Sequence, residues 1–60
     1  MIIAYQSNTG LTIQVNHEKK TYQYKNGFGY DCILNVGTNK RLKELEIALL
    51  SGGYTEQWKS

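Results

Sequence analysis

The chain has 60 residues, of which 40% are hydrophobic, and its formal net charge is +2 at pH 7. This length makes one domain, residues 1–60, with a core too small to leave stability in reserve. Cys32 is the only cysteine and His17 the only histidine, which excludes an internal disulfide and argues against a four-ligand zinc site. We therefore expect no metal and no cofactor, and stabilisation by packing or by self-association.

The first residues carry no signal for export or membrane insertion. Residues 1–6 contain no basic leader, and the sequence holds nothing close to the roughly 18 apolar residues of a membrane span. A single cysteine is typical of a reducing compartment. These features predict a cytoplasmic protein that does not bind membranes.

Residues 1–17 carry the pattern of a β-hairpin. Residues 2–6 favour a strand, and the apolar residues at 11, 13 and 15 alternate with polar ones, as on a strand with one buried face. Asn8-Thr9-Gly10 between the two segments has turn chemistry, because glycine readily adopts a positive φ.

Two further strands are expected after a polar turn at residues 18–20. Residues 21–25, Thr-Tyr-Gln-Tyr-Lys, alternate again and favour a strand. Asn26-Gly27 is a strong hairpin signal, and it leads into residues 28–36, where positions 30, 32, 34 and 36 share one face. The close pair Gly27 and Gly29 leaves a loop or bulge as the alternative for this last segment.

The apolar period changes to that of a helix over residues 39–51. Thr38 or Asn39 is the expected N-cap. Gly52-Gly53 is a glycine C-cap, with Tyr54 packing back on the last turn. Residues 55–60 contain Trp58, which either docks on the domain or stays exposed. The fold class is α+β: a four-stranded antiparallel meander with one C-terminal helix packed on one face (ββββα).

The helix and one face of the sheet should form the only core. Its expected members are Leu42, Leu45, Ala48 and Leu49 against Leu11, Ile13, Val15, Leu34 and Val36. Cys32 belongs to the same strand face as Leu34, where a buried thiol is unreactive. The other face of the sheet is left uncovered.

The titratable residues do not form a catalytic set. A nucleophile needs a base within hydrogen-bond reach and a group that orients the base. His17 is expected as a solvated strand end, while Glu44 and Glu46 are expected on the exposed side of the helix. We therefore expect no catalytic residues and no enzymatic activity.

Lysines and tyrosines gather around the two turns that flank the third strand. Aromatic rings interleaved with lysines can stack bases and neutralise phosphates, and they suit protein interfaces equally well. Tyrosines that fill the core are the alternative. At the helix start, Lys40 and Arg41 oppose the helix dipole, which indicates an anion site or simply a solvated face. The expected partner-binding residues are Lys19, Lys20, Tyr22, Tyr24, Lys25, Lys40 and Arg41.

Some of these cations are placed to converge. Because successive strands of a meander reverse direction, the end of the fourth strand should lie near the turn at residues 18–20. Lys19 and Lys20 would then lie close to Lys40 and Arg41. Cations within about 8 Å of one another reinforce each other and favour an acidic partner.

Residues 11–22 have the pattern of a strand, a charged turn and an aromatic strand. In so small a chain, this pattern resembles small phage or mobile-element accessory proteins of the anti-CRISPR type. The resemblance implies a protein that inhibits a larger host defence or nucleic-acid-processing protein by occluding a surface, in the host cytoplasm. The family's DNA mimics are strongly acidic, and the net charge of +2 argues against that mode.

The leading hypothesis is therefore a non-catalytic binding module for an acidic protein surface. The first alternative is a small nucleic-acid-binding protein that uses the basic and aromatic hairpin. The second is a structural homodimer subunit.

Overall fold

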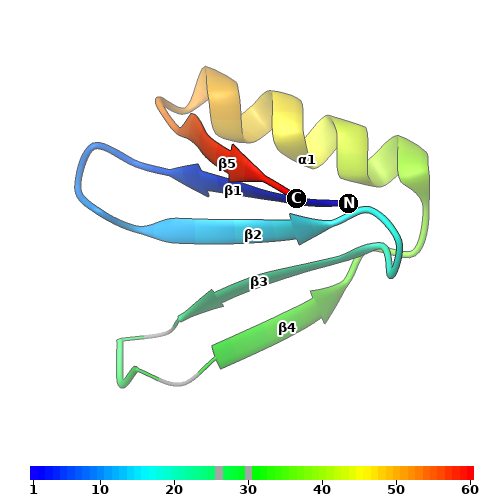
Figure 1. Cartoon of the computed structure of the whole chain (residues 1–60), viewed down its shortest axis with the longest axis horizontal. Coiled ribbons are helices and arrows are strands. Elements are labelled where there is room, and N and C mark those ends of the chain that lie inside the picture. Colours follow the sequence, from blue (N-terminus) through cyan, green and yellow to red (C-terminus); the bar gives the residue numbers. More distant parts are fainter. Residues whose placement is uncertain (26, 30) are drawn as a thin grey trace.

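The computed structural model describes residues 1–25, 27–29 and 31–60. The elements in chain order are β1 (Ile2–Gln6), β2 (Thr12–Asn16), β3 (Thr21–Lys25), β4 (Asp31–Asn35), α1 (Asn39–Ser51) and β5 (Thr55–Lys59). The strands form one antiparallel sheet in the order β4-β3-β2-β1-β5. The helix lies over one face, on the side of β1 and β5 (Figure 1). Within the described residues, no helix has the length and apolar character needed to cross a membrane.

The α+β class and the meander of four strands agree with the prediction, but the helix is not C-terminal. A fifth strand follows it and pairs with β1, so that Ile3 lies opposite Lys59 and Ala4 opposite Trp58. The backbone of Trp58 therefore belongs to the sheet, while its side chain is 47% exposed. Thr55–Lys59 is polar and short, which gives a weak local strand signal, and the strand forms because β1 offers it a free edge.

The predicted hairpin of β1 and β2 is confirmed. The two strands pair from Ile2 with Asn16 to Gln6 with Thr12. The backbone N–H of Ser7 donates to the carbonyl of Leu11 at 2.8 Å, and Gly10 has the positive φ, +90°, that the turn requires.

The fourth strand covers residues 31–35, less than the 28–36 expected. Residues 27–29, including Gly29 with a φ of +83°, form a turn instead, in agreement with the loop alternative. Asn26 and Tyr30, which the sequence prediction also used, lie outside the described residues.

Both helix ends are formed by the expected residues. Thr38 is the N-cap, and its hydroxyl accepts from the backbone N–H of Arg41 at 3.2 Å. At the other end, Tyr54 N–H donates to the Leu49 carbonyl at 3.0 Å, and Gly53 has a φ of +91°. This 6→1 bond after a left-handed glycine is the Schellman motif, and Tyr54 packs against the core as it requires.

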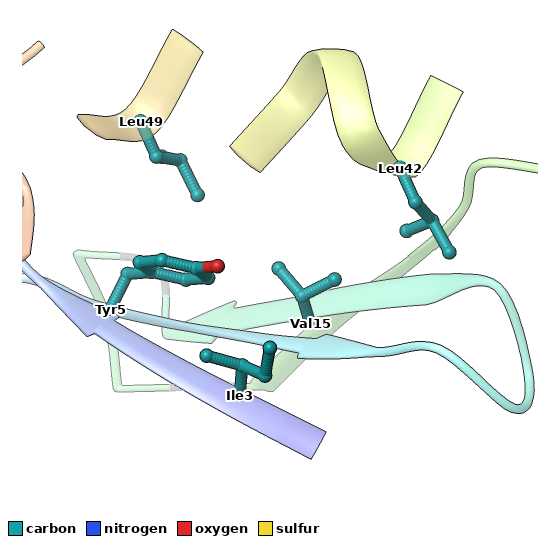
Figure 2. Close-up of a cluster of buried hydrophobic side chains, with 5 residues drawn as sticks. All are labelled: Ile3, Tyr5, Val15, Leu42 and Leu49. Carbon is teal, nitrogen blue, oxygen red and sulfur yellow. The ribbon is translucent and has the colours of Figure 1, made fainter. Parts of the chain in front are cut away.

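The core lies between α1 and the middle of the sheet. It consists of Ile3, Tyr5, Val15, Leu42 and Leu49 (Figure 2). Val15 and Leu42 are completely buried, as their places in the two apolar patterns predict. The sequence prediction omitted the two residues from β1.

Other expected core members lie outside it. Leu11 is 59% exposed, Leu34 is 42% exposed and Ala48 is exposed. Leu45 and Cys32 are half-buried, so Cys32 is not the buried core thiol that was expected. The reason is the position of α1: it packs on β1 and β2, and β4 extends beyond its cover (Figure 1).

Candidate functional site

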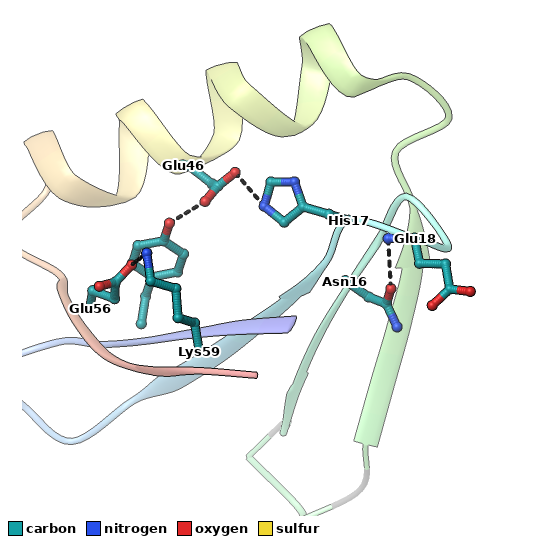
Figure 3. Close-up of polar contacts among 7 residues, drawn as sticks. Asn16, His17, Glu18, Glu46, Glu56 and Lys59 are labelled. Atoms are coloured by element: carbon teal, nitrogen blue, oxygen red, sulfur yellow. Dashed lines mark hydrogen bonds and ion pairs between the residues drawn. The ribbon is translucent and has the colours of Figure 1, made fainter. Parts of the chain in front are cut away.

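The turn between β2 and β3 has a backbone held by specific hydrogen bonds. The side-chain oxygen of Asn16 accepts from the backbone N–H of Glu18 at 3.0 Å and of Lys19 at 2.9 Å (Figure 3). Lys20 has a φ of +57°, in the left-handed region that ends such turns. Lys19 and Lys20 therefore project from a turn of defined shape.

This turn is tied to the start of the helix. The carbonyl of Lys20 accepts a hydrogen bond from the backbone N–H of Val36 at 2.9 Å. The backbone nitrogen of Gly37 lies 3.4 Å from the same carbonyl oxygen. Gly37 is followed at once by Thr38 and α1, so the turn and the helix start lie at the same end of the molecule (Figure 1). We call this the basic end, defined by Lys19, Lys20, Lys40 and Arg41.

The four cations of the basic end outnumber the acidic residues near them in the sequence, which are Glu18 in the same turn and Glu44 on α1. The first turn of α1 contains no acidic residue, and Lys19, Lys40 and Arg41 are exposed. In the part of the chain that the structure describes, no carboxylate lies within ion-pair distance of the four cations. The positive end of the helix dipole adds to their potential. An anionic group of a partner would be attracted to this surface.

The other expected partner-binding residues lie elsewhere. Tyr22 and Tyr24 stack on each other with ring centroids 6.3 Å apart, on the sheet face that carries the helix. Tyr22 also packs against the core. Repulsion by the neighbouring Cys32 sulfur and a hydrogen bond to it raise the pKa of Tyr24 above its usual value. Lys25 ends β3 and lies at the opposite end of the sheet from the basic end.

A groove of about 850 Å³ opens between the β1–β2 loop and the end of the β3–β4 hairpin. Its lining includes Leu11, Ile13, Tyr24, Lys25, Asp31 and Tyr54. Apolar side chains of this kind, with a few charged neighbours, can receive a side chain of a protein partner. The groove and the basic end are at opposite ends of the strands.

A polar cluster that the sequence interpretation missed lies between helix and sheet. One carboxylate oxygen of Glu46 accepts a hydrogen bond from the Tyr5 hydroxyl, and the other lies 2.9 Å from Nε2 of His17 (Figure 3). The His17–Glu46 contact is close but poorly aligned as a hydrogen bond, since Nε2 has no partner of good geometry. The Glu46 side chain is only 13% exposed, which corrects its expected place on the outer side of the helix.

His17 is likewise not a solvated strand end, because its ring points at α1 (Figure 3). Both positions had a signal in the sequence. Glu46 follows Leu42 by four residues and precedes Leu49 by three, which puts it on the buried stripe of the helix. His17 continues the alternation of Ile13 and Val15.

The chemistry of this cluster is limited. Burial, a hydrogen bond to Glu46 and the charges of Glu46 and Glu56 raise the pKa of the Tyr5 hydroxyl. A carboxylate beside a histidine can orient it as a base, but none of the contacts among described residues joins His17 to a serine, threonine or cysteine. The described residues also hold no group of three potential metal ligands. The cluster connects α1 to β1 and to the end of β2.

Comparisons of the chain with models of protein families, with curated proteins and with solved structures find no match. The features of the described residues that could carry a function are the basic end, the groove and the polar cluster.

Proposed function

We propose that the chain is a non-catalytic binding module whose basic end attaches to an acidic surface of a larger protein and occludes it. The observation that carries the proposal is the pair of contacts from the backbone N–H groups of Val36 and Gly37 to the Lys20 carbonyl. They hold the β2–β3 turn against the helix start, so the backbone that carries the cations needs little ordering when a partner binds. Such preorganisation lowers the cost of association.

Occlusion would inhibit the partner. The carboxylates that hold metal ions in nucleic-acid-processing enzymes are one acidic surface of suitable chemistry. A host protein of this kind, in the cytoplasm of the cell, is the target class that we propose. The lone Cys32 suits that reducing setting.

The stacked rings of Tyr22 and Tyr24 favour a second candidate, a protein that binds single-stranded nucleic acid. Two features make it the weaker candidate. Tyr22 packs against the core, which removes part of its surface from stacking. Lys25 is separated from the basic end by the length of β3. A nucleic-acid strand would therefore meet the aromatic and the basic residues on different parts of the surface.

The test removes the basic end and follows capture of the partner. The tagged chain and a variant with Lys19→Ala, Lys20→Ala, Lys40→Ala and Arg41→Ala are used to capture proteins from a nuclease-treated lysate of the host cell. We expect the native chain to retain an acidic protein and the variant to lose it, with unchanged thermal melting. A control with Lys25→Ala, Lys43→Ala and Lys59→Ala should retain it. Equal capture by the native chain and the basic-end variant would contradict the proposal.

A second measurement separates the two candidates. Fluorescence anisotropy with a labelled single-stranded oligonucleotide gives affinity as a function of salt. Phosphate contacts would lower log K with log salt, by about 0.7 per phosphate neutralised. Tight binding with such a slope, lost in the basic-end variant, would favour the nucleic-acid candidate. Weak binding that is the same for both chains is the result expected here.

A further inference from the structure

The two edges of the sheet differ in how well they are protected. On β5, Glu56 and Lys59 carry charges, and the pairing with β1 has an irregular register at Ala4/Tyr5. Charges and bulges on an edge strand oppose pairing with another strand. The other edge, β4, pairs regularly with β3 and consists of Asp-Cys-Ile-Leu-Asn, without lysine or proline. It is the open edge of the sheet.

The direction of the backbone groups of β4 follows from one contact. The backbone N–H of Val36 donates to the carbonyl of Lys20 at 2.9 Å, in the register that pairs Leu34 with Tyr22. In an antiparallel pair, every second residue bonds to the neighbouring strand and those between point away. Residues 34 and 32 therefore bond to β3, while the N–H and C=O groups of residues 31, 33 and 35 point outward from the edge.

We propose that β4 pairs with β4 of a second copy of the chain, antiparallel, about a two-fold axis at Ile33. In this register Ile33 lies opposite Ile33 of the second copy, and Asp31 lies opposite Asn35. All three outward-pointing residues fall on hydrogen-bonded positions, so each pair exchanges both of its N–H···O bonds. A register centred on Cys32 or Leu34 would leave one of the three outward-pointing residues without a partner in β4 of the second copy.

The side chains also match in this register. Ile33 is 64% exposed on the uncovered face and would contact its own copy. Leu34, 42% exposed on the helix side beyond the cover of α1, would lie opposite Cys32. The one charge on the strand, Asp31, would lie opposite a neutral amide, so no like charges face each other.

The whole-molecule geometry favours the antiparallel arrangement. The basic end lies beyond the Asn35 end of β4, so a two-fold axis through Ile33 puts the two basic ends at opposite ends of the shared sheet. Their cations then do not repel each other and stay free to bind. Pairing of two short strands buries less than the roughly 1,200–2,000 Å² of a stable interface. We therefore expect a dissociation constant on the order of 10 μM to 1 mM.

The first experiment is sedimentation equilibrium of the whole chain across that concentration range. The native chain should change from monomer to dimer. Ile33→Lys should stay monomeric, because two lysines would meet at the axis. Ile47→Lys is a matched control, since Ile47 is 62% exposed on α1, and it should dimerise like the native chain. Circular dichroism checks that each variant melts as the native chain does.

The second experiment tests the register and does not depend on the fold of the lysine variant. In a Cys32→Ser background, Ile33→Cys should form a disulfide-linked dimer under mild oxidation, because Cα atoms of a hydrogen-bonded pair lie about 5.5 Å apart. Asn35→Cys, which would face residue 31, should cross-link far more slowly. A native chain that stays monomeric, equal cross-linking at both positions, or dimers unaffected by Ile33→Lys would each overturn the proposal. Capture by β4 of an extended peptide from another protein, with the chain itself monomeric, would overturn it as well.

Discussion

Glu46 lies between the helix and the sheet, where its two carboxylate oxygens contact Tyr5 and His17. A carboxylate that is largely withdrawn from water costs free energy unless donors reach its oxygens. The tyrosine hydroxyl comes from β1 and the imidazole from the residue after β2. One side chain therefore fixes the middle of α1 over two neighbouring strands.

Removal of this carboxylate should destabilise the fold. Glu46→Ala leaves the Tyr5 hydroxyl without its partner in a shielded place, and we expect a loss of about 1–3 kcal/mol in the free energy of unfolding. Glu46→Gln keeps an acceptor for the hydroxyl and should lose less. Urea denaturation at pH 7 measures both. Glu44→Ala is the control, because Glu44 is exposed on the helix, and it should leave the free energy of unfolding unchanged. If Glu46→Ala loses no more than Glu44→Ala, the cluster does not stabilise the fold.

The Tyr5 hydroxyl makes stability depend on pH in the alkaline range. Burial first, and then Glu46, raise its pKa above the usual value of about 10. The usual value is that of Tyr5 in the unfolded chain, and the raised value is that in the folded chain. At a pH between the two, the unfolded chain has lost the proton and the folded chain keeps it. The contribution of neutral Tyr5 is thus complete below about pH 10 and declines as the pH rises through the folded pKa.

This fall in stability at alkaline pH can be measured directly. The free energy of unfolding of the native chain should fall above about pH 10, with a slope from Tyr5 of up to about 1.4 kcal/mol per pH unit. Tyr5→Phe should remove that part of the slope. Tyr24, whose pKa is also raised, contributes equally to both chains and cancels in the comparison. Parallel curves for the two chains between pH 8 and 11 would contradict the assignment.

At the scale of elements, α1 contacts the sheet mainly through its two buried leucines. Leu42 is completely buried and Leu49 is 8% exposed, while Leu45 is half-buried at the margin of the core. Periodicity alone treats the three as equal, because all lie within one broad apolar stripe. Within that stripe, Leu42 and Leu49 are seven residues apart and lie almost on one line along the helix, while Leu45 lies to one side of that line.

Truncation of these leucines should follow burial. Leu42→Ala should cost about 2–5 kcal/mol, enough to unfold much of so small a domain, and Leu45→Ala clearly less. Leu50→Ala is the control, because Leu50 is 53% exposed. Thermal melting of the three variants shows which substitution destabilises the domain most and which least. A larger effect at Leu45 than at Leu42 would place the helix differently from the structure described above.

The elements that could be predicted from the sequence are those with local signals. The first hairpin has a turn with Gly10, and α1 has both of its caps in adjacent residues. β5 has no comparable signal, since its partner is β1 at the far end of the chain. For the same reason the sequence did not show that α1 covers β1, or that Ile3 and Tyr5 belong to the core.

At the scale of the whole molecule, the basic end and the β4 edge are different surfaces. The basic end was indicated by the sequence, because strand reversal in a meander places the β2–β3 turn near the helix start. The second depends on β4 being an edge strand, which only the strand order establishes. The two can be tested separately: the basic-end variant should still dimerise, and Ile33→Lys should still capture the acidic partner.

The pairing of β1 with β5 also has a consequence for synthesis on the ribosome. Ser60 N–H donates to the carbonyl of Ile2 at 2.9 Å, so β1 finds its second neighbour only when β5 has been synthesised. Until then the growing chain can form the β1–β2 hairpin and little of its core, because α1 also comes late. Contacts between such distant residues slow folding, and the domain should therefore reach its folded state only after β5 has been synthesised.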